Sequence, residues 1–140
     1  MALILVRHTT PAVALGICYG QTDLDVRESF PEEAQAVSDA LPKFDRIVTS
    51  PLQRCRKLAD AMAKASGFPV EQDPRLIEMD FGSWEGTPWS DIPRAELDAW
   101  AADFLNARPH GGESVAVLRA RTMEALSDWR DRGSEPLIVT

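Results

Sequence analysis

Arg7 and His8 follow directly after LILV at residues 3–6, an apolar run typical of a strand buried on both faces. In an open α/β sheet, ligands bind beyond the carboxyl ends of the strands, so this strand would carry both side chains to a binding crevice. An imidazole can act as a nucleophile near pH 7, and a guanidinium can grip two oxygens of an anion at once. A solvated strand end would show the same two residues, so the pair alone does not establish a catalytic site.

A second arginine stands in a similar position. DRIVTS at residues 45–50 predicts a strand, and the residues after it predict that a helix begins at once. Ser50 is the expected N-cap, with Pro51 in the first turn and a capping box to Gln53. Arg54 then lies in the first turns, where unpaired amides and the positive end of the helix dipole attract anions. Two arginines and a helix N-terminus suit a bound phosphate.

LIEMDFGSWEG, residues 76–86, carries a candidate acid. Glu78 and Asp80 stand two positions apart beside Phe81 and Trp84, and aromatic surroundings would raise a carboxyl pKa and keep the group protonated as a general acid. The glycines and acids of the same stretch also suit a solvated turn. From the residues alone, the two interpretations are equally good.

Short apolar runs alternate with longer segments of helical period, which indicates an α/β fold built on a parallel sheet. Strands are expected at residues 3–6, 45–50 and 136–140. Helices are expected after Pro31, after Ser50 up to Gly67, after Ser90 and after Gly112, the last two packed on the sheet. Their apolar positions are Ala34, Val37 and Leu41; Leu52, Cys55, Ala59 and Met62; Leu97, Trp100, Ala101 and Phe104; and Val115, Leu118, Thr122, Leu126 and Trp129.

Composition excludes several classes of protein. The chain has 140 residues, 44% of them hydrophobic, which suits one domain over residues 1–140. Its net charge of −7 repels polyanions, so nucleic acid is not an expected partner. No apolar run approaches the length of a membrane span and no basic signal region precedes Arg7, so a cytoplasmic protein without a membrane partner is expected. Cys18 and Cys55 are too far apart for a CxxC pair, so we expect reduced thiols and no metal site.

Four motifs in this order resemble those of the histidine phosphatases, also called the phosphoglycerate mutase-like superfamily. They are Arg7-His8-Thr9-Thr10 after a strand, SPLQR with Arg54, EMDFGSWEG with Glu78, and Gly112-Glu113-Ser114 before a helix. The resemblance spans nearly the whole chain and implies a three-layer sandwich, a mostly parallel sheet with helices on both faces. GICYGQTDLDV and EMDFGSWEGTPWSDIPRAELDAW are most similar to the α-ribazole phosphatase branch, which acts in assembly of the lower ligand of cobalamin.

The resemblance implies a histidine acid-type phosphatase that hydrolyses a small phosphorylated metabolite, α-ribazole 5′-phosphate in that branch, without a metal or other cofactor. His8 would attack phosphorus, Arg7 and Arg54 would hold the phosphoryl oxygens, and water would then cleave the phosphohistidine. Glu78 would protonate the leaving alcohol and then activate the water. The expected substrate contacts are Thr9, Tyr19 and Gln21. A phosphoglycerate mutase-type phosphotransferase and a non-catalytic phosphoester-binding fragment remain alternatives, and a homodimer is left open.

Two departures from the family pattern bear on activity. Thr9 stands where the family usually has glycine. The family also supplies a second active-site histidine just after a late strand, in a context like Val-Thr-His, whereas this chain ends with LIVT at Thr140. His110 precedes a helix on a loop, where we expect a solvated or substrate-edge residue and not a replacement. The expectation is therefore a C-terminally incomplete domain, truncated after Thr140, with lower activity and stability.

Overall fold

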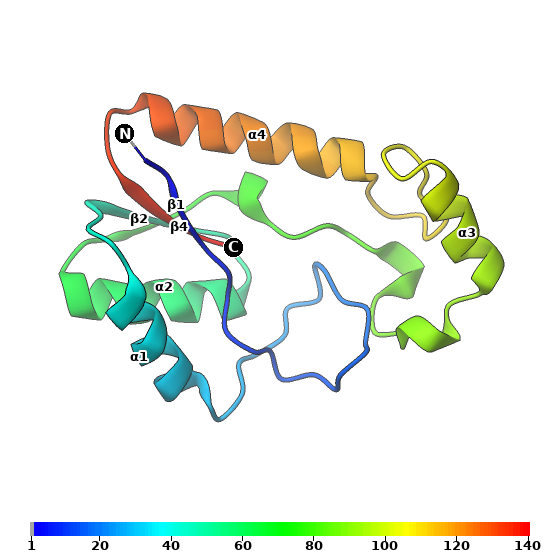
Figure 1. Ribbon diagram of the computed structural model, residues 1–140, viewed down its shortest axis with the longest axis horizontal. Helices are drawn as coiled ribbons and strands as arrows, with labels where there is room; N and C mark the ends of the chain where they lie inside the picture. Colours follow the sequence, from blue (N-terminus) through cyan, green and yellow to red (C-terminus); the bar gives the residue numbers. More distant parts are fainter. Residues whose placement is uncertain (1) are drawn as a thin grey trace.

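The computed structural model describes residues 2–140, and over these residues the chain forms a four-stranded parallel sheet in the order β1-β4-β2-β3 (Figure 1). The strands are β1 (Ile4–Val6), β2 (Arg46–Thr49), β3 (Val70–Gln72) and β4 (Pro136–Val139). The three predicted strands are confirmed. β3 was not predicted, because an edge strand of three residues with two polar side chains carries no apolar run.

Alternate residues of the central strands face opposite layers of helices. Ile47 and Leu137 belong to the core that packs against α1 (Phe30–Ala40) and α2 (Gln53–Ser66). Val48 and Ile138 face the other way and pack with Ala125 and Trp129 of α4 (Val115–Asp131). In Figure 1, α4 accordingly runs above the strands, and α1 and α2 lie below them. The expected three-layer arrangement, with helices on both faces of a parallel sheet, is confirmed.

The predicted start of α2 is wrong by two residues. The helix begins at Gln53, and Leu52 before it is extended, with ψ of 141° and no side-chain cap. Asp23 caps the helix instead: its Oδ1 accepts from the Gln53 backbone N–H at 2.7 Å and its carbonyl accepts from the Gln53 side chain at 2.7 Å. The capping box therefore does not form, because a carboxylate 30 positions away satisfies the first amide. The predicted stop is confirmed, since Gly67 adopts φ of 82° and donates to the Ala63 carbonyl.

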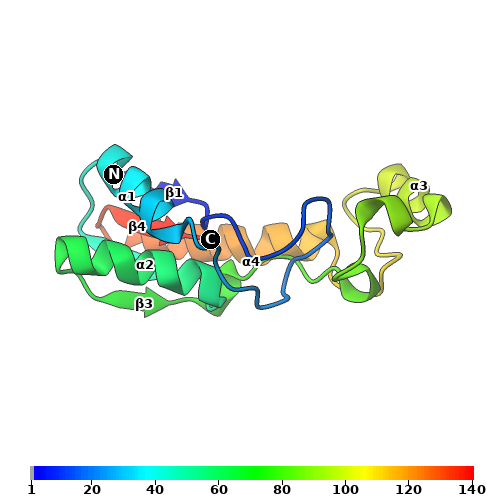
Figure 2. The same cartoon turned by 90° about the horizontal axis from the view of Figure 1, so that it is seen from below.

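The predicted helix after Ser90 forms, but it does not pack on the sheet. α3 (Arg94–Ala102) stands well away from the strands, as Figures 1 and 2 show. It packs through Leu97 and Trp100 against a small core of Cys18, Trp84 and Ile92. The other two residues of its expected stripe, Ala101 and Phe104, are exposed. Three short 3₁₀ helices, η1 (Pro74–Leu76), η2 (Gly82–Trp84) and η3 (Trp89–Asp91), connect β3 to α3. The aromatic residues of this connection offer α3 a closer apolar surface than the sheet does.

Both cysteines are buried and free. Across residues 2–140, no helix combines the length and the apolar composition that a membrane crossing requires. The same residues contain no group of three His, Cys, Asp or Glu side chains placed to hold a metal ion.

Asp73, just beyond β3, connects the sheet to α4. Its carboxylate accepts from the Trp129 indole N–H at 2.8 Å and from the Arg75 guanidinium at 2.8 Å, while its backbone N–H donates to the Thr49 carbonyl. Arg75 in turn pairs with Asp128 of α4 at 2.6 Å. The hydrogen bond from Arg75, assisted by the one from Trp129, lowers the pKa of Asp73 to about 2. The ionised form is therefore the one that this part of the core stabilises.

Replacing Asp73 should change how stability depends on pH. Because the folded-state pKa is depressed, the contribution of Asp73 is present above the ordinary pKa of 3.8 and is lost as pH falls toward about 2. Asp73→Asn should lower the free energy of unfolding by about 2 kcal/mol near neutral pH and by progressively less below pH ~4. Denaturant unfolding at a series of pH values measures the free energy of unfolding. The control is Asp98→Asn, which removes an exposed ion pair with Arg94 within a helix. Parallel pH curves for the wild type and Asp73→Asn would contradict it.

Candidate active site

The carboxyl ends of all four strands lie in register along the same edge of the sheet. Val6, Val139, Thr49 and Gln72 are successive partners across the sheet. Beyond these residues, the His8 backbone N–H donates to the Thr140 carbonyl at 2.8 Å, so the chain is still held against its neighbour where His8 leaves the strand. The carboxyl edge of the sheet thus carries the chemistry-bearing residues that follow β1 and β2.

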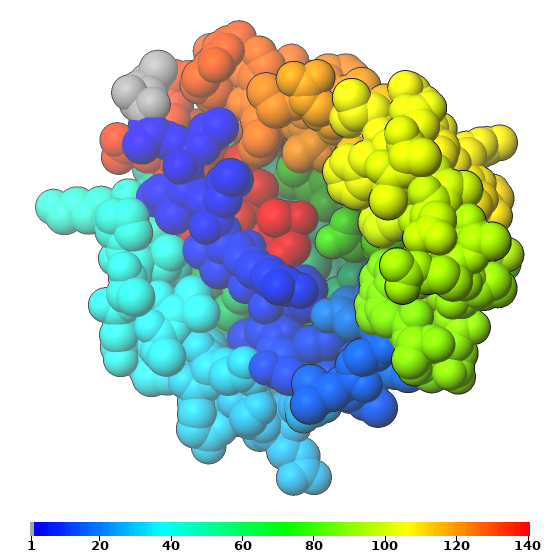
Figure 3. Space-filling view, turned by 45° about the vertical axis from the view of Figure 1, so that its right-hand side comes forward, coloured from blue at the N-terminus to red at the C-terminus, as the bar shows by residue number. Residues whose placement is uncertain are grey.

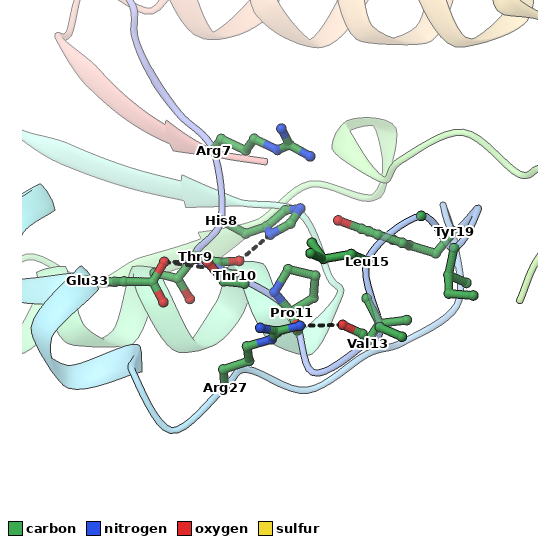
Figure 4. A pocket seen from close by; sticks show the side chains of 13 residues that line it. Arg7, His8, Thr9, Thr10, Pro11, Val13, Leu15, Tyr19, Arg27 and Glu33 are labelled. Carbon is green, nitrogen blue, oxygen red and sulfur yellow. Dashed lines mark hydrogen bonds between the residues drawn. The ribbon is translucent and has the colours of Figure 1, made fainter. Parts of the chain in front are cut away.

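One hydrogen bond determines the tautomer of His8. Its Nδ1 lies 2.7 Å from the Thr9 carbonyl oxygen (Figure 4). A carbonyl oxygen can only accept, so Nδ1 carries the proton and the lone pair of the neutral ring lies on Nε2. Burial lowers the pKa of His8, as do the charges of Arg54 and Arg7, against the opposing effects of the Thr9 hydrogen bond and Glu78. The ring is therefore held neutral and nucleophilic near pH 7.

Arg54 is a buried charge, with 1% of its surface exposed. Its Nη1 and Nη2 donate to the carbonyls of Thr22 and Gly20 at 2.7 and 2.6 Å, and its guanidinium lies over the Tyr19 ring at 5.2 Å. Its Nε–H has no hydrogen-bond partner within residues 2–140. The guanidinium is fixed in place and, among these residues, keeps an N–H without a partner. Because its charge also acts on His8, it is suited to hold an anion at the imidazole. Arg7, the other arginine, is exposed on the surface beside His8.

Glu78 lies on the other side of His8. With Leu5, Arg7, His8 and Thr140 it lines a hollow at the carboxyl edge of the sheet. In Figure 3 this hollow lies between the N-terminal segment and the lobe around α3. Of the two interpretations that the sequence left open, the structure does not bear out burial against aromatic rings, because Glu78 is exposed. Within residues 2–140, its Oε1 accepts from the backbone N–H of Met79 alone, at 2.7 Å.

The neighbours of Glu78 have structural roles. Phe81 and Trp84 pack edge-on against Trp100, with ring centroids 6.1 and 5.5 Å apart. Asp80 Oδ1 accepts from the Gly82 backbone N–H at 2.8 Å, so the turn interpretation holds for Asp80. The aromatic side chains therefore support the α3 lobe and leave Glu78 open to solvent.

A pocket of about 400 Å³ opens beside His8 (Figure 4). Figure 4 shows the Tyr19 hydroxyl pointing toward the side of the pocket where His8 lies. One wall is largely apolar and comes from the loop at residues 13–17. The residues that line the whole pocket include Thr9, Thr10, Val13, Leu15, Ile17, Tyr19, Arg27 and Glu33. Arg27 donates to the carbonyls of Pro11 and Val13 at 3.0 and 2.6 Å and so holds the start of this loop in place.

The structure unites most of the predicted site residues. Arg7, His8, Thr9 and Tyr19 share this pocket, and the charges of Arg54 and Glu78 act on His8 from outside it. Thr9 is buried, and within residues 2–140 only glycines have positive φ, so threonine is accommodated there without left-handed strain. Gln21 is the exception.

Gln21 lines a different pocket, with Asp80, Arg108 and Glu113. It is therefore not placed on the wall beside His8, where we expected it to contact the leaving group. His110 also lies apart from His8. It is 3% exposed, against an expectation of a solvated residue, and its ring packs edge-on against Trp84 at 4.9 Å. Its Nδ1 accepts from the Gly112 backbone N–H at 2.9 Å, so it serves the loop before α4.

A side chain that the sequence did not predict for the site holds the backbone of Glu78. Arg121 of α4 donates to the carbonyls of Arg75, Ile77 and Glu78 at 2.7, 2.5 and 3.2 Å. Both oxygens of Glu113 in turn accept from its guanidinium, each at 2.8 Å. Glu113 belongs to the Gly-Glu-Ser motif, which was the available signal for this clamp.

Comparison with known proteins identifies the family of the chain. The family model described as histidine phosphatase superfamily, branch 1, matches residues 3–140. A glucosyl-3-phosphoglycerate phosphatase from Mycolicibacterium vanbaalenii is 33% identical, over 98% of this chain and 66% of that protein. An adenosylcobalamin/alpha-ribazole phosphatase from Salmonella typhimurium is 31% identical, over 91% of this chain and 66% of that protein.

A solved structure shares the fold. The crystal structure of the alpha-ribazole phosphatase from Shigella flexneri superposes with a TM-score of 0.85 at 25% identity, covering 99% of this chain and 72% of that one. The chain therefore spans about two thirds of the length of the curated relatives above, 66% in each case. By the match over residues 3–140 and by these relatives, the chain belongs to the histidine phosphatase superfamily.

Proposed function

We propose that the protein is a phosphomonoesterase that transfers the phosphoryl group of a small metabolite first to His8 and then to water. The observation that carries the proposal is the neutral His8 ring, with its Nε2 lone pair available, beside the guanidinium groups of Arg7 and Arg54. The phosphatase activities named for its relatives support the same class of reaction.

In the first step, His8 Nε2 attacks phosphorus in line, an N–P bond forms and the P–O bond to the alcohol breaks. Glu78 gives its proton to the departing alkoxide. In the second step a water attacks phosphorus, Glu78 takes the proton of that water, and the N–P bond breaks to return the lone pair to Nε2. The two guanidinium groups stabilise the charge on the equatorial oxygens in both transition states.

The wall of the pocket favours an alcohol with an apolar, aromatic part. Val13, Leu15 and Ile17 present hydrocarbon beside Tyr19, and Leu15 is 92% exposed at the rim. Arg27, the cation of this wall, is engaged by backbone carbonyls of the same loop. These features support α-ribazole 5′-phosphate as the substrate, and a role in assembling the nucleotide loop of cobalamin, over a sugar phosphate that carries a carboxylate.

Trapping the phosphoenzyme tests the nucleophile. Rapid quenching with a ³²P-labelled phosphomonoester should label the wild type at histidine. His8→Ala should show no label and no turnover, and Glu78→Gln should slow formation or breakdown of the label by roughly a hundredfold, as loss of acid–base assistance does. Histidine-linked label that persists in His8→Ala would lie on His110, the other histidine, and would overturn the assignment. Labelling that appears only with a bisphosphorylated primer would indicate a mutase instead.

The apolar wall predicts an order of substrates. The kcat/KM for α-ribazole 5′-phosphate should exceed that for glucosyl-3-phosphoglycerate, and Leu15→Ser should lower the former about fivefold through lost apolar contact. The same variant should leave kcat/KM for methyl phosphate unchanged, because that ester does not reach the rim. Steady-state kinetics on the three esters measures this. An equal loss on methyl phosphate, or the reverse order of the two large esters, would contradict it.

The electrostatics of His8 can be measured without turnover. Its lowered pKa means that half-protonation should occur below the ordinary value of 6.5 in an NMR titration of the ring carbons. Because the positive charge of Arg7 contributes to the lowering, Arg7→Gln should move the midpoint upward. Arg108→Gln is the matched control: Arg108 lowers the pKa of His110, so that midpoint should move and the midpoint of His8 should not. An unchanged His8 midpoint in Arg7→Gln would show that Arg7 does not act on the imidazole.

A further inference from the structure

Glu85 is a carboxylate that the proposed chemistry does not use, and three consecutive backbone amides surround it. The Gly20 N–H lies 2.7 Å from Oε2, the Gln21 N–H 2.6 Å from Oε1 and the Thr22 N–H 3.2 Å from Oε1. Successive N–H groups that converge in this way form a concave site for an anion. Here the anion is a side chain that comes from more than 60 positions further along the chain.

The other side of the same loop holds Arg54. The carbonyls of Gly20 and Thr22 accept from Nη2 and Nη1 at 2.6 and 2.7 Å. The Gly20 carbonyl and the Gln21 N–H belong to one peptide unit, so a single peptide group connects the Glu85 carboxylate to the Arg54 guanidinium. Its dipole points its negative end at the cation and its positive end at the anion, and each hydrogen bond polarises the other.

We infer that Glu85 is a positioning residue for Arg54: by holding the loop at residues 20–22, it aims the guanidinium at the phosphoryl group and so sets the affinity of the site. The inference rests on the proposed function in one respect, that Arg54 holds a phosphoryl group. It assigns to Glu85 no contact with the substrate.

Arg54 depends on this loop because, among residues 2–140, the two loop carbonyls are the only hydrogen-bond acceptors of its side chain, and the Tyr19 ring beneath the guanidinium adds no acceptor. The side chain is 1% exposed, and among residues 2–140 no carboxylate forms a salt bridge with it. A buried guanidinium without a carboxylate needs strong acceptors, and the two carbonyls supply them only while the loop keeps its shape. An arginine has several rotatable bonds, so loss of either carbonyl would let the fork turn away from His8. A donor that is fixed in advance stabilises charge in the transition state without reorganisation.

Glu85 is itself held by contacts within the α3 lobe. Trp84, 2% exposed, donates from its indole N–H to Glu96 at 2.6 Å and packs edge-on against Trp100 at 5.5 Å. The Gly86 N–H donates to the Cys18 carbonyl at 2.8 Å, which closes the turn behind Glu85. In Figures 1 and 2 the α3 lobe lies far from the strands, and this turn is one of the links between the lobe and the site.

The loop has little room to adopt another shape. A Cβ on Gly20 would lie 1.8 Å from the Met79 carbonyl oxygen, so the loop backbone passes directly against the segment that carries Glu78. Glu85 on one side and Met79 on the other confine the peptide that Arg54 contacts. Removing the carboxylate therefore releases the side of the loop that packing does not restrain.

The experiment compares Glu85→Gln with Asp98→Asn, a carboxylate of the same lobe that is exposed on α3 and pairs with Arg94. Glutamine keeps the shape but replaces one acceptor oxygen with an NH₂ group, which faces backbone N–H groups. Calorimetric titration with inorganic phosphate should show about a tenfold weaker affinity for Glu85→Gln, the scale of one lost charge-assisted interaction. Asp98→Asn should bind phosphate as the wild type does. Glu85→Asp keeps the charge with a shorter reach and should recover part of the loss.

Two further measurements separate positioning from general destabilisation. In proton–nitrogen spectra, the Arg54 Nη groups should give separate signals in the wild type, because rotation of the bound guanidinium is slow, and these should merge in Glu85→Gln. An Arg54→Gln variant, which also assigns the signals, should bind phosphate weakly, and adding Glu85→Gln should weaken it no further. Losses that add in the double variant, or Nη signals that stay separate, would overturn the inference.

If the proposed function is wrong, the same experiments give a different set of results. A wild type whose phosphate binding does not depend on Arg54 would overturn the phosphatase assignment and the claimed effect of Glu85 on affinity together. The Nη signals of Arg54 would still decide whether Glu85 holds the guanidinium.

Discussion

Insertion of β4 between β1 and β2 is the constraint on which the site depends. The strand is buried along its whole length and pairs in parallel with both neighbours, so Val6, Val139 and Thr49 stand at one level. The chain leaves β1 through Arg7 and His8, and it leaves β2 toward Arg54. Residues almost 50 positions apart therefore meet at one edge, because parallel strands in register end together.

Burial of charge governs the second level of organisation. A guanidinium in the interior needs full hydrogen bonding, and here peptide carbonyls provide it in place of a carboxylate. A paired carboxylate directly against Arg54 would compete with a phosphoryl group for the same donors. Placing Glu85 one peptide group away holds the cation and leaves its remaining donors free. The Arg121–Glu113 pair follows a similar principle at Glu78, where a partly buried ion pair restrains the backbone of an exposed acid.

Local sequence patterns predicted most of the fold. The apolar runs that became β1, β2 and β4 are recognisable, and β4 is apolar throughout because both of its faces are covered. β1 is not the doubly covered strand that its apolar run predicts, because it lies at the edge of the sheet and its Leu5 is 57% exposed. Gly67 stopped α2 as predicted, because a left-handed C-cap is a local requirement. The errors involve residues whose environment is not local: Asp23 displaced Ser50 as the cap of α2, and α3 packed on its own aromatic lobe.

For the site, the sequence by itself determined which side chains are present and that His8 and Arg54 follow apolar strands. It identified the family through four motifs, because those motifs keep their chemistry and order. Only the tertiary structure decided that Gln21 lies in another pocket, that Glu78 is exposed and that Glu85 faces the loop behind Arg54. The physical reason is the range of the interactions. Strand and cap propensities act within a few residues, whereas the direction of a charged side chain depends on donors and acceptors that folding brings from distant parts of the chain.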